Sequence, residues 1–519
     1  MNNKHPKSLK VRVIALLIFM TVTLYLSVEL CLFISDQYVF YSAVTEQGLP
    51  YYTRVQKSRY KNLTDEEKGR FKLAQKKAAT LESATNLVRI TIGLITTLIV
   101  GYISDRFGRR VAIGILLIGE ALHIALVSLI VLLKLNLWLI LLPGLFEAIF
   151  GGGLLSLFAQ VAAILVDICR TGAKNEETVE KAQSSDRECG YGSPIGGALI
   201  YRFGFPAAMF TSLALVIPSL ILIFCLPETN MNRGKKKITE VGFVSDITNN
   251  DPENEDIRSI AMEFDKSLKS RIANKFRDLK SLDPVLITIM SMVLLGSIAA
   301  LADLQYVAVY LMGPPFLWSP EHVGLYSGIT DVTATVISVV FTIIIIKLDE
   351  KRKARAKADE EQRISSQDAV EIYQPQKHYT RQLNLLVAVF AVSLIMLIIN
   401  RSVVGVAHRF QLPTANILVY VAAVPRLMKS FCVPLVRTMF SICTHPSKQG
   451  MIQSVGAFVS RIGLLISLTV LPAIYAATVL IFQESVFIVV VILITVTLII
   501  DLCVPFIVRR ENAKLKSVE

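Results

Sequence analysis

Charged residues are scarce in this sequence. Asp, Glu, Lys and Arg make up 18% of the 519 residues, whereas 53% are hydrophobic and the mean hydropathy is +0.54. A soluble domain averages about 45–50% apolar and about 25% charged residues. The composition therefore argues against a water-soluble fold and predicts an all-α protein with many membrane-spanning helices.

Cysteine is also sparse, and the usual sequence marks of an enzyme are missing. The seven cysteines are an odd number, and no Cys/His pair has zinc-ligand spacing. There is no His-x-x-x-x-Asp acyltransferase pair, no Walker A loop and no metal-ligand cluster. We therefore expect no disulfide scaffold, no catalytic residue, no bound metal and no cofactor. Five cysteines in or beside apolar stretches are expected to pack as small apolar side chains: Cys31, Cys225, Cys432, Cys443 and Cys503.

Basic residues outnumber acidic ones and give a net charge of +13. Lys and Arg cluster in the loops between apolar stretches, which is the distribution of the positive-inside rule rather than of a nucleic-acid-binding face. We expect a lipid bilayer as partner, no nucleic acid, and both chain termini in the cytosol.

Long apolar runs dominate what the sequence does contain. The first, Val13–Ile34, is longer than the core of a signal peptide and predicts a spanning helix. A twelfth span has to come from 182–203, where only Tyr191–Phe203 is apolar and helix-like. Either that helix is short and lined by protein and water, or this sequence lacks it. The other predicted spans are 84–104, 111–133, 137–168, 205–226, 284–312, 322–346, 383–401, 414–442, 450–476 and 483–508.

Polar segments separate these spans. Residues 227–283 divide residues 1–226 from residues 284–519, and each part is predicted to hold a six-helix half. Within 227–283, apolar residues recur every three to four positions and predict an amphipathic helix, lying on the inner membrane face or packed on the protein. The sequon at Asn62 falls outside the membrane and is a predicted glycosylation site. A second sequon, at Asn400, lies too near the membrane for a glycan to be expected.

The loop between the second and third predicted spans reads Gly101-Tyr-Ile-Ser-Asp-Arg-Phe-Gly-Arg-Arg110. It resembles the G-x-x-x-D-R-x-G-R-R motif of the major facilitator superfamily, which implies that superfamily's fold of two six-helix halves. A carboxylate there can pair with arginines or with a helix N-terminus and so latch one conformation. The alternative is a basic turn that only anchors the helices. The predicted gating residues are Gly101, Asp105, Arg106, Gly108, Arg109 and Arg110.

Further stretches resemble the proton-coupled folate transporter family (solute carrier family 46). They are Asp36-Gln-Tyr-Val39, Gly151–Ser156 with Asp167-Ile168, Gly313–Trp318 with Gly324, and Arg437–Ser441 with Ser447–Gly450. The resemblance implies a carrier for folates, haem-like compounds or other bulky organic solutes, in several members coupled to protons. Within the first stretch, Gln37 and Tyr38 are expected to contact the solute. Two departures leave proton coupling open: Glu188 is out of register with the glutamate of the family's fifth helix, and Lys448 replaces another glutamate.

Charges inside the spans are few, and each needs a reason because it costs roughly 2.5–3.5 kcal/mol at the bilayer centre. Tyr25, Glu29 and Asp36 share one face of the first span, and Glu120 and His123 form a similar pair in the third. A buried acid can bind and release a proton near neutrality. A role as a buried, hydrogen-bonded fixture explains each of these residues equally well. The proton-coupling candidates are Glu29, Asp36, Glu120, His123 and Glu147.

The second half supplies cations. Arg426, Lys429 and Arg437 lie in one sector of the tenth span, and Arg461 adds a cation in the eleventh. Guanidinium groups recognise carboxylate or phosphate, so these residues are predicted to bind an anionic group of the solute. Alternatively, Arg437 reaches the cytosolic interface and the others pair with Asp303 or Asp331.

Together these patterns predict a secondary transporter for an organic solute that is anionic, folate-like or otherwise bulky. Alternating access would move the solute, with or without a coupled proton. The alternative is a carrier-like receptor or scaffold that no longer transports. A monomer in the plasma membrane or the lysosomal membrane is expected, and the sequence names neither the solute nor the membrane.

Overall fold

The structure is a computed structural model that describes residues 7–50, 63–170, 192–227, 284–302, 306–338, 340–341, 344, 375–443 and 449–516. Within these ranges every regular element is a helix. Nine helical stretches among the described residues are long and apolar enough to cross a membrane. The prediction of an all-α membrane protein is confirmed. The predicted glycosylation site Asn62 and nearly all of the segment 227–283 lie outside the described residues.

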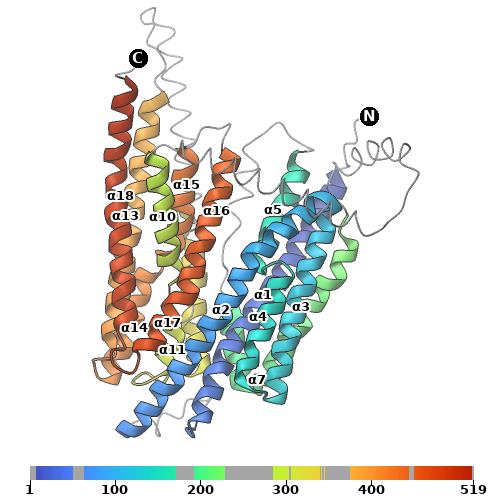
Figure 1. Ribbon diagram of the computed structural model, residues 1–519, viewed down its shortest axis with the longest axis vertical. Coiled ribbons are helices and arrows are strands. Elements are labelled where there is room, and N and C mark those ends of the chain that lie inside the picture. The colour runs from blue at the N-terminus through green and yellow to red at the C-terminus, as the bar shows by residue number, and fades with distance from the viewer. Residues whose placement is uncertain are drawn as a thin grey trace, which may run out of the picture.

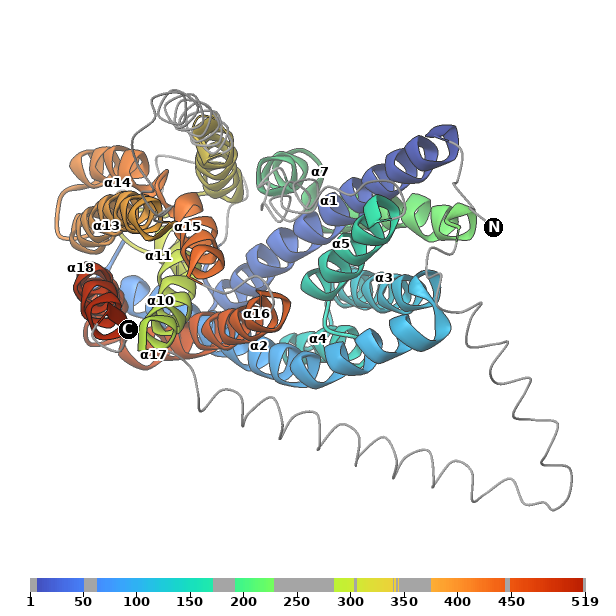
Figure 2. The same cartoon turned by 90° about the horizontal axis from the view of Figure 1, so that it is seen from above.

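The first part of the chain forms a group of helices that lie together (Figures 1 and 2). A capping box starts the second helix, since the Thr64 side chain accepts a hydrogen bond from the Glu67 backbone and the Glu67 carboxylate accepts one from the Thr64 backbone. The elements are α1 (Lys7–Glu46), α2 (Asp65–Phe107), α3 (Arg109–Leu133), the 3₁₀ turn η2 (Leu137–Ile140), α4 (Leu141–Ile149), α5 (Leu154–Arg170), α7 (Gly192–Leu222) and the 3₁₀ turn η3 (Ile223–Cys225).

The segment α7 consists of two helices that run in opposite directions. Gly204 interrupts the helical backbone with φ 80° and ψ 175°. On one side of it, the Gly192 N–H donates to the Glu29 carboxylate of α1 at 3.1 Å. On the other side, the hydroxyls of Ser27 and Ser212 each donate to the other residue's carbonyl at 2.7 Å. Both sides of Gly204 therefore reach the same level of α1, and the short apolar helix predicted within 182–203 is present from Gly192 onwards.

The second part of the chain forms the other group of helices (Figures 1 and 2). Glu484 joins two of them at one end, because it accepts a hydrogen bond from Arg409 at 2.7 Å and lies 3.2 Å from Nε2 of His408. Hydrogen bonding to Glu484, and then the carboxylate charge, raise the pKa of the Arg409 guanidinium. The elements are α10 (Pro284–Leu301), α11 (Tyr306–Met312), a helix over 320–338, α13 (Pro375–Ala407), α14 (Leu412–Arg426), α15 (Lys429–Ile442), α16 (Gln449–Leu465), the π-helical turn η6 (Ile466–Val470), α17 (Leu471–Thr478) and α18 (Ser485–Lys516).

The two groups meet along α2, which crosses from one to the other. The π-helical turn η6 widens the helix between α16 and α17, and two of its carbonyls accept hydrogen bonds from α2. The contacts that cross are Gln75 to the Tyr475 hydroxyl (3.1 Å), Ser83 to the Thr469 carbonyl (2.7 Å), Asn86 to the Leu468 carbonyl (3.2 Å) and Arg461 to the Thr97 hydroxyl (2.9 Å). These hydrogen bonds can break and reform one by one. The groups also meet where α7 packs closely against helix 320–338, beside Gly197 and Gly324.

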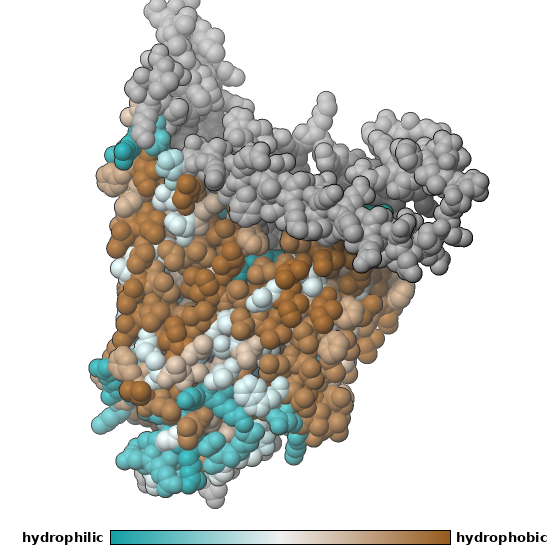
Figure 3. All heavy atoms as spheres, viewed as in Figure 1, coloured by the Kyte–Doolittle hydropathy of each residue, from teal (hydrophilic) through white to brown (hydrophobic). Residues whose placement is uncertain are grey.

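The outer surface is apolar where lipid would contact it. Hydrophobic side chains cover the middle of the visible face, and hydrophilic ones gather at its lower end (Figure 3). Large apolar side chains such as Ile95, Phe203 and Ile217 are exposed. In water an apolar surface of this extent would cause association, whereas lipid tolerates it.

Candidate functional site

The fourth span is broken in its middle. Helix α4 ends at Ile149 and α5 begins at Leu154, and between them Gly151, Gly152 and Gly153 have φ of 127°, 77° and 76°. Residues with a side chain rarely adopt such angles, so the three glycines permit the turn. The span predicted at 137–168 is present, but the sequence analysis did not predict this break.

Three ionisable side chains meet beside the break. Glu120 and His123 come from α3, and Glu147 comes from the last turn of α4. Nδ1 of His123 lies 2.6 Å from Oε2 of Glu147. Each of the three residues offers one atom that could bind a metal ion, and these three atoms lie within 4.8 Å of one another. All three side chains are buried. The structure therefore brings together three of the five residues predicted to bind protons.

The Glu120 carboxylate differs from its neighbours. It is 1% exposed, and neither of its oxygens has a hydrogen-bond partner among the described residues. A Cβ added to Gly153 would overlap Oε1 of Glu147 and lie 3.3 Å from Oε1 of Glu120. Both carboxylates therefore point at the space beside the Gly153 Cα atom. A residue with a side chain at position 153 would collide with Glu147.

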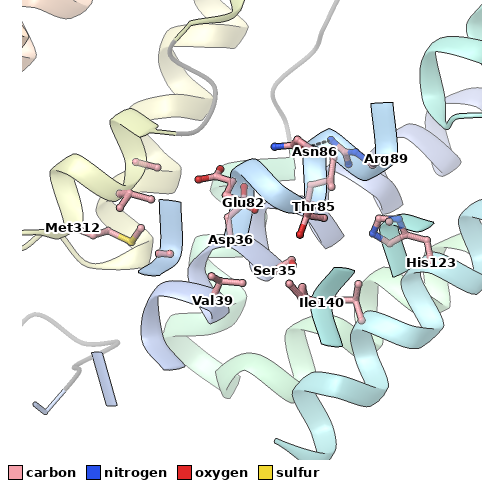
Figure 4. A pocket seen from close by; sticks show the side chains of 16 residues that line it. Ser35, Asp36, Val39, Glu82, Thr85, Asn86, Arg89, His123, Ile140 and Met312 are labelled. Carbon is pink, nitrogen blue, oxygen red and sulfur yellow. Dashed lines mark hydrogen bonds between the residues drawn. The ribbon is translucent and has the colours of Figure 1, made fainter. Parts of the chain in front are cut away.

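A cavity of about 50 Å³ adjoins this cluster (Figure 4). Asp36 of α1 and Glu82 of α2 lie near each other on one side of it, and His123 lies on the other. Arg89 of α2 lies between them, with Nη1 3.7 Å from Oε2 of Glu147 and Nη2 donating to Asn86 at 2.9 Å. Helix α11 of the second group closes the cavity with apolar side chains. The space suits water molecules or an ion, not a bulky solute.

Arg89 and Glu82, which α2 contributes to this cavity, are not among the predicted site residues. Arg89 lies inside the predicted span 84–104, so its charge alone could have marked it. Glu82 ends the preceding polar stretch and gave no such sign. Only the packing of α2 against α1 and α3 brings both side chains to the acidic cavity.

The remaining acidic candidate, Glu29, lies apart from the cavity lining. Its carboxylate accepts hydrogen bonds from the Tyr25 hydroxyl and the Gly192 backbone. Gln37 is fully buried, and its side-chain amide has no hydrogen-bond partner among the described residues. The ring of Tyr38 packs against that of Phe205, with centroids 5.6 Å apart.

Two of the predicted cations share one carboxylate. Nη2 of Arg426 lies 3.2 Å and Nζ of Lys429 lies 3.0 Å from Oδ1 of Asp331. Arg426 also donates to the Thr330 hydroxyl and lies over the Tyr326 ring, 5.4 Å from its centroid. Pairing with Asp331 was one of the alternatives that the sequence left open.

The other two cations lie elsewhere. Arg437 lines a separate, smaller cavity of about 10 Å³ with residues of α10 and α16, including Met292 and Ser460. Arg461 donates across the interface to Thr97. The four cations therefore do not form one cluster in this structure, since residues 427–428 separate α14 from α15 and turn Arg437 away from Arg426.

The turn between α2 and α3 is tight. Gly108 alone separates the helices and has φ 115°, whereas a Cβ on Gly101 would meet no atom within 4 Å. The arginines of the turn have local partners: Arg106 donates to Tyr102, Arg109 to Ser104 and Arg110 to the Phe224 carbonyl. The Asp105 side chain lies outside the described part of the chain, so the latch stays a prediction.

The second sequon is inside the helical bundle. Asn400 is fully buried in α13 and donates to the Ala422 carbonyl of α14 at 2.7 Å. A glycan could not be attached there without unfolding the helix pair, which agrees with the expectation that this sequon is not used.

The architecture is that of the major facilitator fold. A peptide transporter of the POT family bound to alafosfalin aligns with 95% of this chain and 95% of its own, with 13% identity and a TM-score of 0.52. A mutant of the nucleoside transporter NupG aligns with 93% of this chain and 99% of its own, with 9% identity and a TM-score of 0.53. The human organic anion transporter MFSD10 aligns with 96% of this chain and 100% of its own, at 14% identity and a TM-score of 0.48.

The first two similarities show the fold and no more, because their sequence identities are so low. No family model and no curated protein sequence matches the chain. The resemblance to the proton-coupled folate transporter family therefore stays a prediction.

Proposed function

We propose that this chain is a secondary active transporter that moves an organic anion across a membrane by alternating access. Peptide and nucleoside transporters share its fold over nearly the whole chain, which supports a carrier. In the proposed cycle the two helix groups rock against each other around a central site. We further propose a monomer in the plasma membrane or the lysosomal membrane, with both termini in the cytosol.

The observation that carries this proposal is the separation of charge between the two groups. The first group places four carboxylates in or beside the cavity that Arg89 lines: Asp36, Glu82, Glu120 and Glu147, of which Glu120 and Glu147 are buried. The second group carries two cations at one carboxylate, a third, Arg437, at a small cavity within the group, and a fourth, Arg461, that reaches across the interface. Charges inside a membrane protein are retained where they serve a solute or an ion path. Acidic groups in one half and separate cations in the other suit an anionic solute together with a cation.

Arg461 is the cation best placed to sense movement. Its guanidinium extends from α16 to the Thr97 hydroxyl of α2, so it bridges the two groups. A carboxylate or phosphate of the solute is a stronger partner for a guanidinium than a neutral hydroxyl. Binding of an anion would therefore replace the Thr97 contact and release one of the bonds that hold the groups together. The proposed solute-binding residues are Arg437, Arg426, Lys429, Arg461, Gln37 and Tyr38.

The cavity of about 50 Å³ is too small for such a solute. Solute entry therefore requires that the contacts along α2 open, which is the movement that alternating access supplies. The closed arrangement described above would be one state of that cycle.

Asp36 is the proposed proton-binding group. The ionisable groups that face it across the cavity are Glu82 and Arg89 from α2 and His123 from α3, whereas α11 contributes apolar side chains only. Among the residues that line the cavity, the carboxylates of Asp36 and Glu82 have one nearby cation, Arg89, and two ionised carboxylates beside it would repel each other. A proton on Asp36 removes this repulsion. Glu29, held by Tyr25 and the Gly192 backbone, is the second candidate.

The test is uptake into sealed proteoliposomes of radiolabelled folates, porphyrins and peptide-like anions, with and without an imposed pH gradient. We expect one anion class to accumulate when the gradient is present and to stop accumulating when a protonophore collapses it. Arg461→Met should lower uptake by at least about tenfold, since it removes a charge-assisted contact. Asp36→Asn should keep exchange of labelled for unlabelled solute but lose gradient-driven accumulation. Binding without uptake would instead indicate a carrier-like receptor.

A further inference from the structure

The break in the fourth span brings together a set of atoms that suits a metal ion, which the sequence analysis did not expect. Oxygens of Glu120 and Glu147 and a ring nitrogen of His123 lie within 4.8 Å of one another. None of these residues is more than 8% exposed. The spacing of Glu120 and His123 places both on one face of α3, but only the packing of α4 against α3 brings Glu147 to them.

Glu120 gives a second and separate sign of a ligand. Its two oxygens are buried without a hydrogen-bond partner among the described residues, and they point at the space over Gly153. Buried polar atoms in native proteins almost always have a partner, because leaving a carboxylate without one is strongly unfavourable. A cation between Glu120 and Glu147 would supply the missing interaction.

The surroundings favour positive charge. Helix α4 ends two residues after Glu147, and the C-terminal end of a helix carries partial negative charge. Arg89 supplies one positive charge at 3.7 Å from Glu147, so Glu120 would be ionised only with a further cation beside it. Discontinuous spans near the middle of a transporter are also where ions bind in other membrane proteins.

We propose that Glu120, His123 and Glu147 bind a divalent transition-metal ion of the zinc or manganese class. An imidazole nitrogen with two carboxylates is a ligand set that these ions accept. Magnesium and calcium ions prefer oxygen ligands alone, so the histidine argues against them. This inference goes beyond the proposed function, because metal binding can be measured on the purified protein without any transport.

The experiment uses the full chain in detergent after removal of metals with a chelator. Zinc chloride is titrated in by calorimetry, and Mn²⁺ binding is followed by electron paramagnetic resonance. We expect about one equivalent of ion per chain and a loss of affinity of at least about tenfold in Glu120→Gln. Because Glu120 has no hydrogen-bond partner to lose among the described residues, the amide should fold normally, which size-exclusion chromatography and the unfolding temperature check.

The matched control is Asp501→Asn. Asp501 of α18 is also fully buried, and its oxygens also have no hydrogen-bond partner among the described residues. Its substitution removes the same charge from the second helix group and should leave metal binding unchanged. Equal binding in wild type and Glu120→Gln would overturn the proposal, because the ion would then sit on other ligands. Absence of Zn²⁺ and Mn²⁺ binding, or stronger binding of Mg²⁺ or Ca²⁺, would overturn it as well.

Discussion

At the scale of single residues, Asp331 is the point where two cations from other helices converge, with Arg426 at 3.2 Å and Lys429 at 3.0 Å from its carboxylate. The charges inside the apolar runs predict acidic side chains in the first half of the chain and basic ones in the second. Which acid meets which base did not follow, because helical periodicity fixes a face and not the neighbour that covers it. Asp331 illustrates the point, because both of its partners come from other helices.

Asp331→Asn should therefore destabilise the protein. The amide would leave Arg426 and Lys429 without a carboxylate at 3.2 and 3.0 Å. Removing one partner of a fully buried ion pair costs roughly 3–5 kcal/mol, and less where one partner is partly exposed. Both cations are buried and the Asp331 side chain is 20% exposed, so we expect a smaller but measurable fall in the unfolding temperature of the purified protein. The measurement is thermal unfolding in detergent.

The double variant Asp331→Asn with Lys429→Met tests the cause. If an uncompensated lysine is what destabilises the single variant, removing it should restore part of the unfolding temperature. An unfolding temperature of Asp331→Asn equal to that of wild type would show that this ion pair contributes nothing to stability.

At the scale of helices, glycines with positive φ produce the break in the fourth span and the reversal within α7, and hydropathy predicts neither. Apolar runs located most of the spans because lipid requires long apolar helices. The same runs concealed the break after Ile149 and the reversal at Gly204, since a left-handed residue changes direction without changing hydropathy. The three consecutive glycines were quoted as part of a family resemblance, and their backbone role emerged only from their φ angles.

Gly152→Ala is expected to destabilise the fold. The added Cβ would lie 2.9 Å from both Cα and O of Gly93 on α2, and φ of Gly152 is 77°. A left-handed φ alone costs an L-residue roughly 1–2 kcal/mol, and overlap with backbone atoms adds to it. Gly101→Ala is the matched control, because a Cβ there meets nothing within 4 Å. Thermal unfolding should separate the two variants, and equal unfolding temperatures would contradict this account of the break.

At the scale of the whole molecule, polar contacts along α2 form part of the interface between the two helix groups. Side chains of Ser83 and Asn86 reach carbonyls of the π-helical turn η6. Hydrogen bonds of this kind contribute only about 1 kcal/mol each, so a few can be exchanged during a conformational change. The interface therefore has the properties that two interconverting arrangements need.

A cross-link between Ser83→Cys and Thr469→Cys should lock this arrangement. The Ser83 hydroxyl lies 2.7 Å from the Thr469 carbonyl, which brings the two backbones within reach of a disulfide or a short thiol-reactive linker. In a background with the native cysteines replaced, oxidation should abolish uptake into proteoliposomes, and a reductant should restore it. Each single cysteine variant serves as the control.

The outcome bears on the whole carrier proposal, because a transporter must separate these residues in every cycle whereas a rigid receptor need not. Cross-linked protein that still moved solute at the wild-type rate would mean that α2 and η6 never part, and alternating access around this interface would then be wrong. Loss of uptake with retained solute binding would instead place the movement between α2 and η6. The same pair of variants, labelled with a spectroscopic probe, would then report whether an anion at Arg461 opens the contact, as replacement of its Thr97 hydrogen bond predicts.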